Sequence, residues 1–135
     1  MATEQIQYPT YLDAVLIHFT TMDRFGETRY GVAERSLIES ALARPRHAAV
    51  YENADIFRQA ATLCFGLIKN HPWWGGNKRT ATAIAEWFLV ANGWRLSYTN
   101  QEIIDLSLAI EADRYGVDDI EAWYRQRTTL IGKPQ

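Results

Sequence analysis

One stretch of the chain combines residue types that could carry out chemistry on a phosphate group, and it runs from His71 to Thr80 as His-Pro-Trp-Trp-Gly-Gly-Asn-Lys-Arg-Thr. The pair Gly75-Gly76 permits backbone conformations in which consecutive N–H groups point inward. A helix that begins just after these glycines would add the positive end of its dipole. The stretch therefore predicts an anion-binding loop that leads into a helix N-terminus.

The polar side chains of this loop suit a polyphosphate ligand. Lys78 supplies a point charge, Arg79 a bidentate fork and Asn77 a neutral donor or a helix cap. His71 is the one nearby group that can take a proton from an attacking hydroxyl near neutral pH. No thiol or serine nucleophile accompanies it, and the spacing is not that of a P-loop, so transfer of a phosphate-containing group is favoured over acyl chemistry. The alternative from composition alone is a plain helix start with solvated charges.

Two helices must position the loop. Apolar residues recur at three and four residues between about 53 and 69, which predicts a core helix, with Gly66 at a close helix crossing. Pro72 biases His71 away from helical geometry, so the imidazole is expected just past the end of this helix. A second core helix is expected over 80–91, with the pair Asn92-Gly93 at its C-terminal cap.

Shorter helices are expected before this pair. Thr10 followed by Asp13 predicts a capped helix start, with His18 beside its apolar face as a structural or surface residue. The residues of that face are Leu12, Val15, Leu16 and Phe19. A second helix is expected over 36–43 and to stop at the pair Arg44-Pro45. The arginines of the resulting loop, 44–47, would form a solvated turn or border a phosphate site.

The C-terminal part continues the helical pattern. Residues 94–98 alternate in polarity but have no evident partner, so an extended connector is expected rather than a strand. Thr99 and Glu102 match a capping box that opens a fifth helix, and Asp118 opens a sixth that carries Leu130. Trp87 and Trp123 are expected in the core, and one of Trp73 and Trp74 is expected to pack under the loop.

Composition bounds the class of protein. The 135 residues are 47% hydrophobic, which suits one compact domain over 1–135 with a core of about 8–130. The predicted fold is an all-α bundle of about six helices. Fourteen basic and 16 acidic residues give a net charge of −2, so direct nucleic-acid binding is not expected. With no signal peptide or membrane span evident, and a lone Cys64 in an apolar run, the chain is expected to be cytoplasmic.

Residues 71–79 resemble the His-x-Phe-x-acid-x-Asn-Lys-Arg motif of the death-on-curing (Doc) toxins, a branch of the Fic/Doc (Fido) superfamily. The resemblance covers roughly residues 8 to 125. Outside the motif it is carried by Gly31-Val32, residues 37–45, residues 67–70 and residues 91–93. It implies an all-α Fido-type toxin of a toxin–antitoxin module, which uses ATP to phosphorylate a threonine of elongation factor Tu and is inhibited by a separate antitoxin protein.

Carried onto matching positions, the resemblance makes His71 the general base, Asn77 a phosphate or metal-shell contact, and Lys78 and Arg79 the phosphate clamp. Gly75 and Gly76 complete the nucleotide-binding loop, and Trp73 takes the family's aromatic position as the loop anchor. The AMP-transferring Fic enzymes carry Gly-Asn-Gly-Arg-x-x-Arg instead. Here Lys78 replaces the second glycine and Thr82 replaces the second arginine, which favours the Doc kinase.

The chain departs from the family at position 75. The acidic residue that holds Mg²⁺ in the family is Gly75 here, so the loop has no carboxylate for a metal. Charge on the transferred group would be neutralised by Lys78, by Arg79, or by a metal held mainly by ATP. Three functions stay open: a protein kinase, an enzyme that transfers AMP to a protein hydroxyl, and a degenerate domain that binds nucleotide or antitoxin without catalysis.

Overall fold

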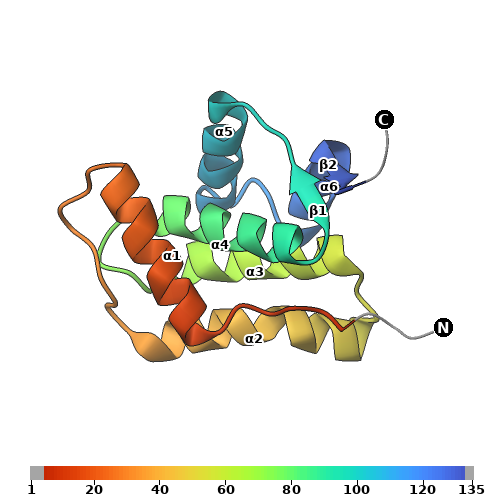
Figure 1. Ribbon diagram of the computed structural model, residues 1–135, viewed down its shortest axis with the longest axis horizontal. Helices are drawn as coiled ribbons and strands as arrows, with labels where there is room; N and C mark the ends of the chain where they lie inside the picture. The colour runs from red at the N-terminus through yellow and green to blue at the C-terminus, as the bar shows by residue number, and fades with distance from the viewer. Residues whose placement is uncertain (1–4, 133–135) are drawn as a thin grey trace.

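Helices dominate the part of the chain that the computed structural model describes, residues 5–132 (Figure 1). In chain order the elements are α1 (Tyr11–Arg24), α2 (Arg35–Glu52), α3 (Ile56–Asn70), α4 (Asn77–Ala91), β1 (Trp94–Leu96), α5 (Asn100–Glu111), α6 (Val117–Arg127) and β2 (Thr128–Leu130). These six helices of the described region confirm the prediction of an all-α bundle.

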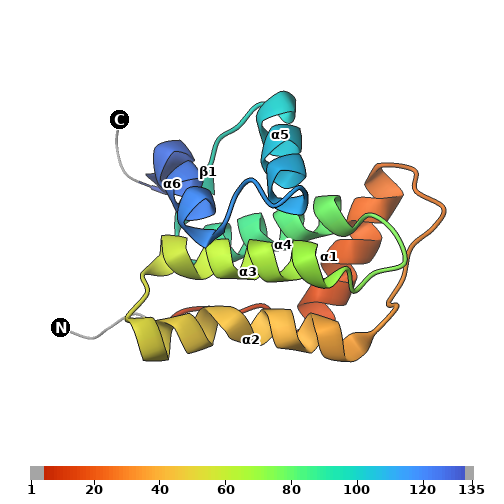
Figure 2. The same ribbon diagram turned by 180° about the vertical axis from the view of Figure 1, so that it is seen from behind.

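The two central helices, α3 and α4, lie side by side and are covered on both sides. Figures 1 and 2 show α2 along one side of this pair and α5 and α6 on the other, with α1 crossing near the start of α4. The loop between α3 and α4 therefore lies at one end of the bundle. Three helices, α1, α4 and α5, converge near it.

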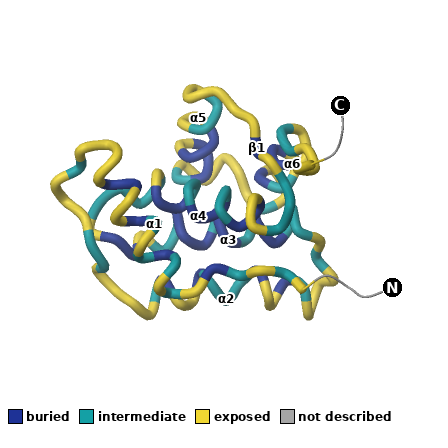
Figure 3. Tube along the Cα trace, in the orientation of Figure 1, coloured by how far each residue is buried: buried dark blue, intermediate teal, exposed yellow. Residues whose placement is uncertain are grey.

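The core is built mainly from α3 and α4, where buried positions are concentrated (Figure 3). Cys64, which lies in an apolar run of the sequence, is fully buried among them. Trp123 is also buried, and Trp87 is partly buried against the core. The two central helices contribute Ala60, Ala61, Leu63, Leu67, Ile68, Ala81, Ile84, Ala85, Phe88 and Leu89 to the fully buried set.

The predicted stop at Pro45 is wrong, because α2 continues through it to Glu52. Pro45 cannot donate a backbone hydrogen bond, which would ordinarily end or bend the helix. Here its ring is buried, and so are the α2 residues that share its face, namely Ile38, Ala41 and Ala48. Packing of this face against the core outweighs the missing hydrogen bond. The arginines on either side of Pro45 are therefore helical, and neither lines the cleft described below.

Gly66 lies at a close crossing of α2 and α3, as predicted. A Cβ added at Gly66 would lie 2.9 Å from Cδ of Arg44 and 3.4 Å from Cβ of Ala41. The absence of a side chain thus lets α2 approach α3 closely.

The predicted core face of α1 is wrong. Leu12, Leu16 and Phe19 are exposed, and only Val15 of that set packs partly against the core. The buried face instead carries Ala14, His18, Thr21 and Met22. This face meets the loop after α3 through His18, whose ring stacks on Trp73, and through Met22, which lies against Gly76.

Residues 94–96 form a strand, which corrects the prediction of an unpaired connector. Strand β1 pairs antiparallel with β2, with Trp94 opposite Leu130 and Leu96 opposite Thr128. The partner was hidden because residues 128–130 were expected to continue the sixth helix, which ends at Arg127. β-branched threonines favour the extended conformation at this point.

The local signals for helix starts were reliable. The predicted cap at Thr10 and the predicted capping box at Thr99 are both present, with the Thr10 side chain accepting from the Asp13 N–H and the Thr99 side chain accepting from the Glu102 N–H. Within residues 5–132, no helix combines the length and apolar character that crossing a membrane requires.

Candidate active site in the loop between α3 and α4

His71 ends α3 and lies at the mouth of a cleft. It is the C-terminal cap residue, in the left-handed conformation with φ 48° and ψ 54°, and its side chain is exposed. The preceding residue, Asn70, donates a side-chain hydrogen bond to the carbonyl of Leu37 at 2.9 Å, which fixes the end of α3 to α2. The predicted place of His71, just past the helix end, is confirmed.

The loop after His71 is bonded along its length to the connection between α1 and α2. The N–H of Trp74 donates to the carbonyl of Gly31 at 2.9 Å, and the N–H of Ala33 donates to the carbonyl of Pro72 at 2.9 Å. Val32 and Trp73 form an antiparallel bridge between the same two segments. The backbone of the loop is therefore set by residues about 40 positions earlier in the chain.

The buried side chain of Trp73 anchors the loop in the core. It is 2% exposed, whereas Trp74 is 56% exposed, so one of the two indoles packs under the loop as predicted. The Trp73 ring stacks on the imidazole of His18, with ring centroids 4.1 Å apart and planes 12° from parallel.

His18 ties three segments together, a role that the sequence did not reveal. Its Nε2 accepts a hydrogen bond from the N–H of Gly31 at 2.8 Å, so its proton lies on Nδ1, which donates to Oγ1 of Thr80 at 2.8 Å. Burial lowers the pKa of His18 to about 4. The imidazole is therefore neutral at physiological pH and joins α1 to Gly31 and to the first turns of α4.

Asn77 closes the loop on itself. Its Oδ1 accepts from the N–H of Trp73 at 3.0 Å, and its Nδ2 donates to the carbonyl of Trp73 at 3.0 Å. Both ends of the amide are thus engaged within the loop. The side chain acts here as a clamp on the loop backbone.

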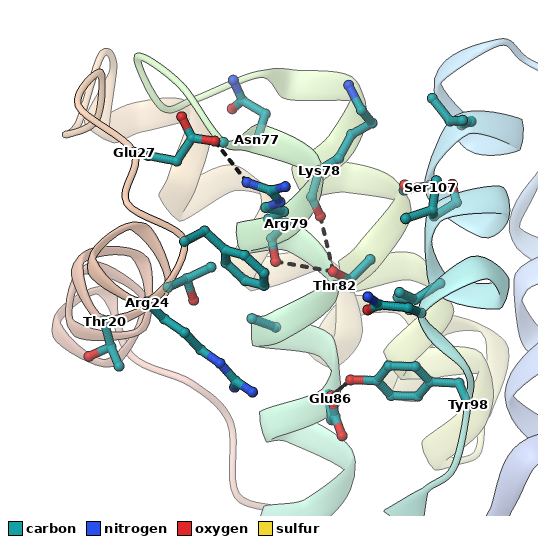
Figure 4. A pocket seen from close by; sticks show the side chains of 18 of the residues that line it. Thr20, Arg24, Glu27, Asn77, Lys78, Arg79, Thr82, Glu86, Tyr98 and Ser107 are labelled. Atoms are coloured by element: carbon teal, nitrogen blue, oxygen red, sulfur yellow. Dashed lines mark hydrogen bonds and ion pairs between the residues drawn. The ribbon is translucent and has the colours of Figure 1, made fainter.

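Each of the two cations that follow the glycines is paired with a carboxylate, and Figure 4 shows the pair of Arg79 with Glu27. Nη1 of Arg79 lies 2.8 Å from Oε1 of Glu27, and its guanidinium lies over the ring of Phe25 at 4.3 Å. Nζ of Lys78 lies 3.0 Å from Oε2 of Glu111, at the end of α5. All four charged side chains are between one third and one half exposed, so an incoming anion can compete for these pairs.

A cleft of about 830 Å³ opens beside the loop (Figure 4). This volume falls within the range of small-molecule sites. One side is formed by the end of α1 and the residues after it, the other by α5, and α4 lies between them. The lining residues are Thr20, Thr21, Arg24, Phe25, Glu27, His71, Gly76, Asn77, Lys78, Arg79, Thr82, Ala83, Glu86, Tyr98, Asn100, Ile103, Ile104, Ser107 and Leu108.

The far part of the cleft contains polar groups that the sequence did not identify. Oη of Tyr98 donates to Oε1 of Glu86 at 2.5 Å, and burial together with this carboxylate raises the pKa of Tyr98 to about 12. Arg24 reaches into the cleft from α1 and has no carboxylate partner within residues 5–132 (Figure 4). Arg24 lies on α1, about 50 residues before the loop, so no local sequence pattern could have linked it to the site.

The start of α4 can bind an anion. The first N–H groups of a helix have no acceptor within it, and no side chain caps the start of α4. Gly76, Asn77, Lys78 and Arg79 all line the cleft that His71 borders. The fold therefore brings together every residue of the predicted phosphate-binding set except Gly75, which is not part of the cleft lining.

The donor set does not fit a divalent metal. Within residues 5–132, no group of three or more His, Cys, Asp or Glu side chains is placed to hold a metal ion. Glu27 and Glu86, which line the cleft, already have partners in Arg79 and Tyr98, and Glu111 is paired with Lys78. Gly75 supplies none.

Fold and loop define a helical domain with a histidine at the entrance of a basic, glycine-containing loop. The sequence model of the Fic/DOC family matches residues 8–89, which is more than half of the chain and includes α1 to α3, the whole loop and all but the last two residues of α4. The chain therefore belongs to the Fic/DOC family, whose members are typically transferases that act on protein hydroxyl groups. A comparison with curated proteins gave no significant match.

Proposed function

We propose that this protein is a Doc-like toxin that transfers the γ-phosphoryl group of ATP to a threonine or serine hydroxyl of a protein. The observation that carries the proposal is the shared cleft, which His71 borders together with the free N-terminus of α4, Lys78 and Arg79. A proton acceptor and a phosphate-binding helix start are the two parts that such a transfer needs.

The reaction follows from these groups. The acceptor hydroxyl oxygen attacks the γ-phosphorus while its proton passes to a ring nitrogen of His71. The bond from the γ-phosphorus to the β–γ bridging oxygen breaks, and ADP leaves with that electron pair. N–H groups at the start of α4, with Lys78 and Arg79, stabilise the charge on the transferred group. Before this step, ATP binding separates Lys78 from Glu111 and Arg79 from Glu27, so that both cations can contact the phosphates.

The residue at position 82 supports transfer of a phosphoryl group rather than of AMP. Thr82 lines the cleft, and its hydroxyl lies 3.1 Å from the carbonyls of Lys78 and of Arg79, one turn earlier in α4. Thr82 occupies the position at which the AMP-transferring enzymes carry their second arginine, so this chain lacks that arginine. This favours phosphoryl transfer over AMP transfer.

The substrate and partner follow from the resemblance to Doc toxins. We expect elongation factor Tu as the phosphorylated protein, arrest of translation as the consequence, and a cognate antitoxin as the inhibitor. The chain has no evident match to the inhibitory Ser/Thr-x-x-x-Glu-Gly/Asn motif of Fic proteins, which favours inhibition by a separate protein.

Purified protein incubated with elongation factor Tu and ATP labelled at either the α or the γ phosphate tests the proposal. We expect label on the factor from γ-labelled ATP alone. Label from α-labelled ATP would instead establish AMP transfer. No label from either nucleotide would reject the enzymatic proposal for this substrate.

A second function is favoured by specific contacts. Both cations of the loop are already paired with carboxylates, and Gly75 provides no metal ligand. A domain that binds nucleotide or antitoxin without catalysis would have these features. Nucleotide binding that does not require Mg²⁺, with no transfer to any protein, would support this function over the kinase.

A further inference from the structure

Position 75 is closed to any side chain. A Cβ added at Gly75 would lie 2.2 Å from the carbonyl oxygen of Arg29 and 3.2 Å from its carbonyl carbon. The backbone of Gly75 does not have a positive φ, unlike that of Gly76, which has a φ of 66°. Glycine is therefore required at position 75 for space rather than for backbone conformation.

The obstructing backbone cannot move aside at low cost. Two residues after Arg29, the N–H of Gly31 donates to the buried imidazole of His18 at 2.8 Å, and its carbonyl accepts from the N–H of Trp74 at 2.9 Å. Moving Arg29 away from the loop would strain or break these hydrogen bonds, which include one to a fully buried ring. Such bonds are costly to lose.

The neighbouring glycine is enclosed from the other side. A Cβ added at Gly76 would lie 2.3 Å from Cε of Met22, a fully buried residue of α1. The pair Gly75-Gly76 is therefore held between α1 and the connection that follows it. The backbone of the loop therefore has no room to shift and accommodate a carboxylate side chain at position 75.

We infer that the loop binds anions without a divalent metal held by the protein, and that the α1–α2 connection excludes an acidic residue at position 75. The absence of an acidic residue at position 75 thus follows from the packing of the loop against the α1–α2 connection. A single substitution at position 75 does not restore a metal ligand. This inference deepens the proposed function but is tested by metal binding and stability. Its failure is therefore distinguishable from a failure to transfer phosphate.

The test compares Gly75→Asp with Gly116→Asp. A Cβ at Gly116 meets no atom within 4 Å, and its φ of −100° suits any residue, so Gly116→Asp adds the same charge without a clash. We expect Gly75→Asp to lower Tm by roughly 5 °C or more. Gly116→Asp is expected to change Tm by no more than roughly 2 °C, because aspartate is favourable at a helix N-cap.

Magnesium binding is measured by titration calorimetry on the wild-type chain and on both variants. We expect no saturable Mg²⁺ binding in any of them at millimolar concentrations. The inference would be overturned by Mg²⁺ binding to the wild-type chain that His71→Ala weakens, or by a Gly75→Asp variant that keeps its Tm and gains Mg²⁺ binding. The wild-type titration decides the matter even if Gly75→Asp does not fold.

Discussion

The imidazole of His18 on α1 and the indole of Trp73 in the loop stack face to face, with their centroids 4.1 Å apart. This contact joins the first helix of the fold to the residue that follows Pro72. The histidine that the sequence marks for catalysis is exposed, whereas the histidine that holds the loop is fully buried. Loop position in this protein thus depends on a residue far from it in sequence.

Stability should depend on pH through His18. Its folded-state pKa of about 4 is below the usual value of 6.5, so the folded state binds fewer protons than the unfolded state between these values. The stabilisation is therefore complete above pH 6.5 and is lost as pH falls toward 4. The full effect amounts to at most roughly 3 kcal/mol.

Urea unfolding of the wild type and of His18→Gln from pH 7.5 to pH 4.5 measures this effect. Glutamine can hydrogen-bond to Gly31 but does not titrate. The difference in unfolding free energy between the two proteins should shrink as pH falls. A difference that stays constant over this range would contradict the assignment.

Removing the Asn77 side chain should loosen the loop. Asn77→Ala leaves both backbone groups of the buried Trp73 without their partners, and we expect a loss of about 1–3 kcal/mol in the free energy of unfolding. Gln101→Ala is the control and should cost less than about 0.5 kcal/mol, since the Gln101 side chain bonds to the exposed Asp105 and to no other group within residues 5–132. Equal losses in the two variants would show that the amide does not clamp the loop.

Glu27 should compete with phosphate for Arg79. In Glu27→Gln the cation is released, and we expect ATP to bind roughly two- to fivefold more tightly, as measured by fluorescence of the loop tryptophans. Glu39→Gln removes the same charge from an exposed pair with Arg35 on α2 and should leave affinity unchanged. Weaker ATP binding in Glu27→Gln, or the same change in both variants, would count against a phosphate site at Arg79.

Sequence reasoning succeeded where the determinants are local. The capping pair Thr10 and Asp13, and the break at Pro72 that delivers His71 to the loop, depend on residues within four positions of one another. The succession of helix end, His71, glycine loop and helix start was predictable for the same reason.

Sequence reasoning failed where distant segments decide the outcome. Pro45 remains helical because its face of α2 is buried against the core. Strand β1 forms because it pairs with β2, and this pairing was not predictable because β2 lies more than thirty residues later in the chain. The pairing of Arg79 with Glu27 and the carbonyl that blocks Gly75 also come from segments remote in sequence. No local pattern encodes such contacts.

The most direct test of the central claim is the rate of γ-phosphoryl transfer to elongation factor Tu in the wild type and in His71→Ala. General base catalysis typically contributes about 10²–10⁴-fold, so the variant should be slower by about that factor while ATP affinity changes little. Transfer by His71→Ala at the wild-type rate would contradict the assignment of His71 as the base.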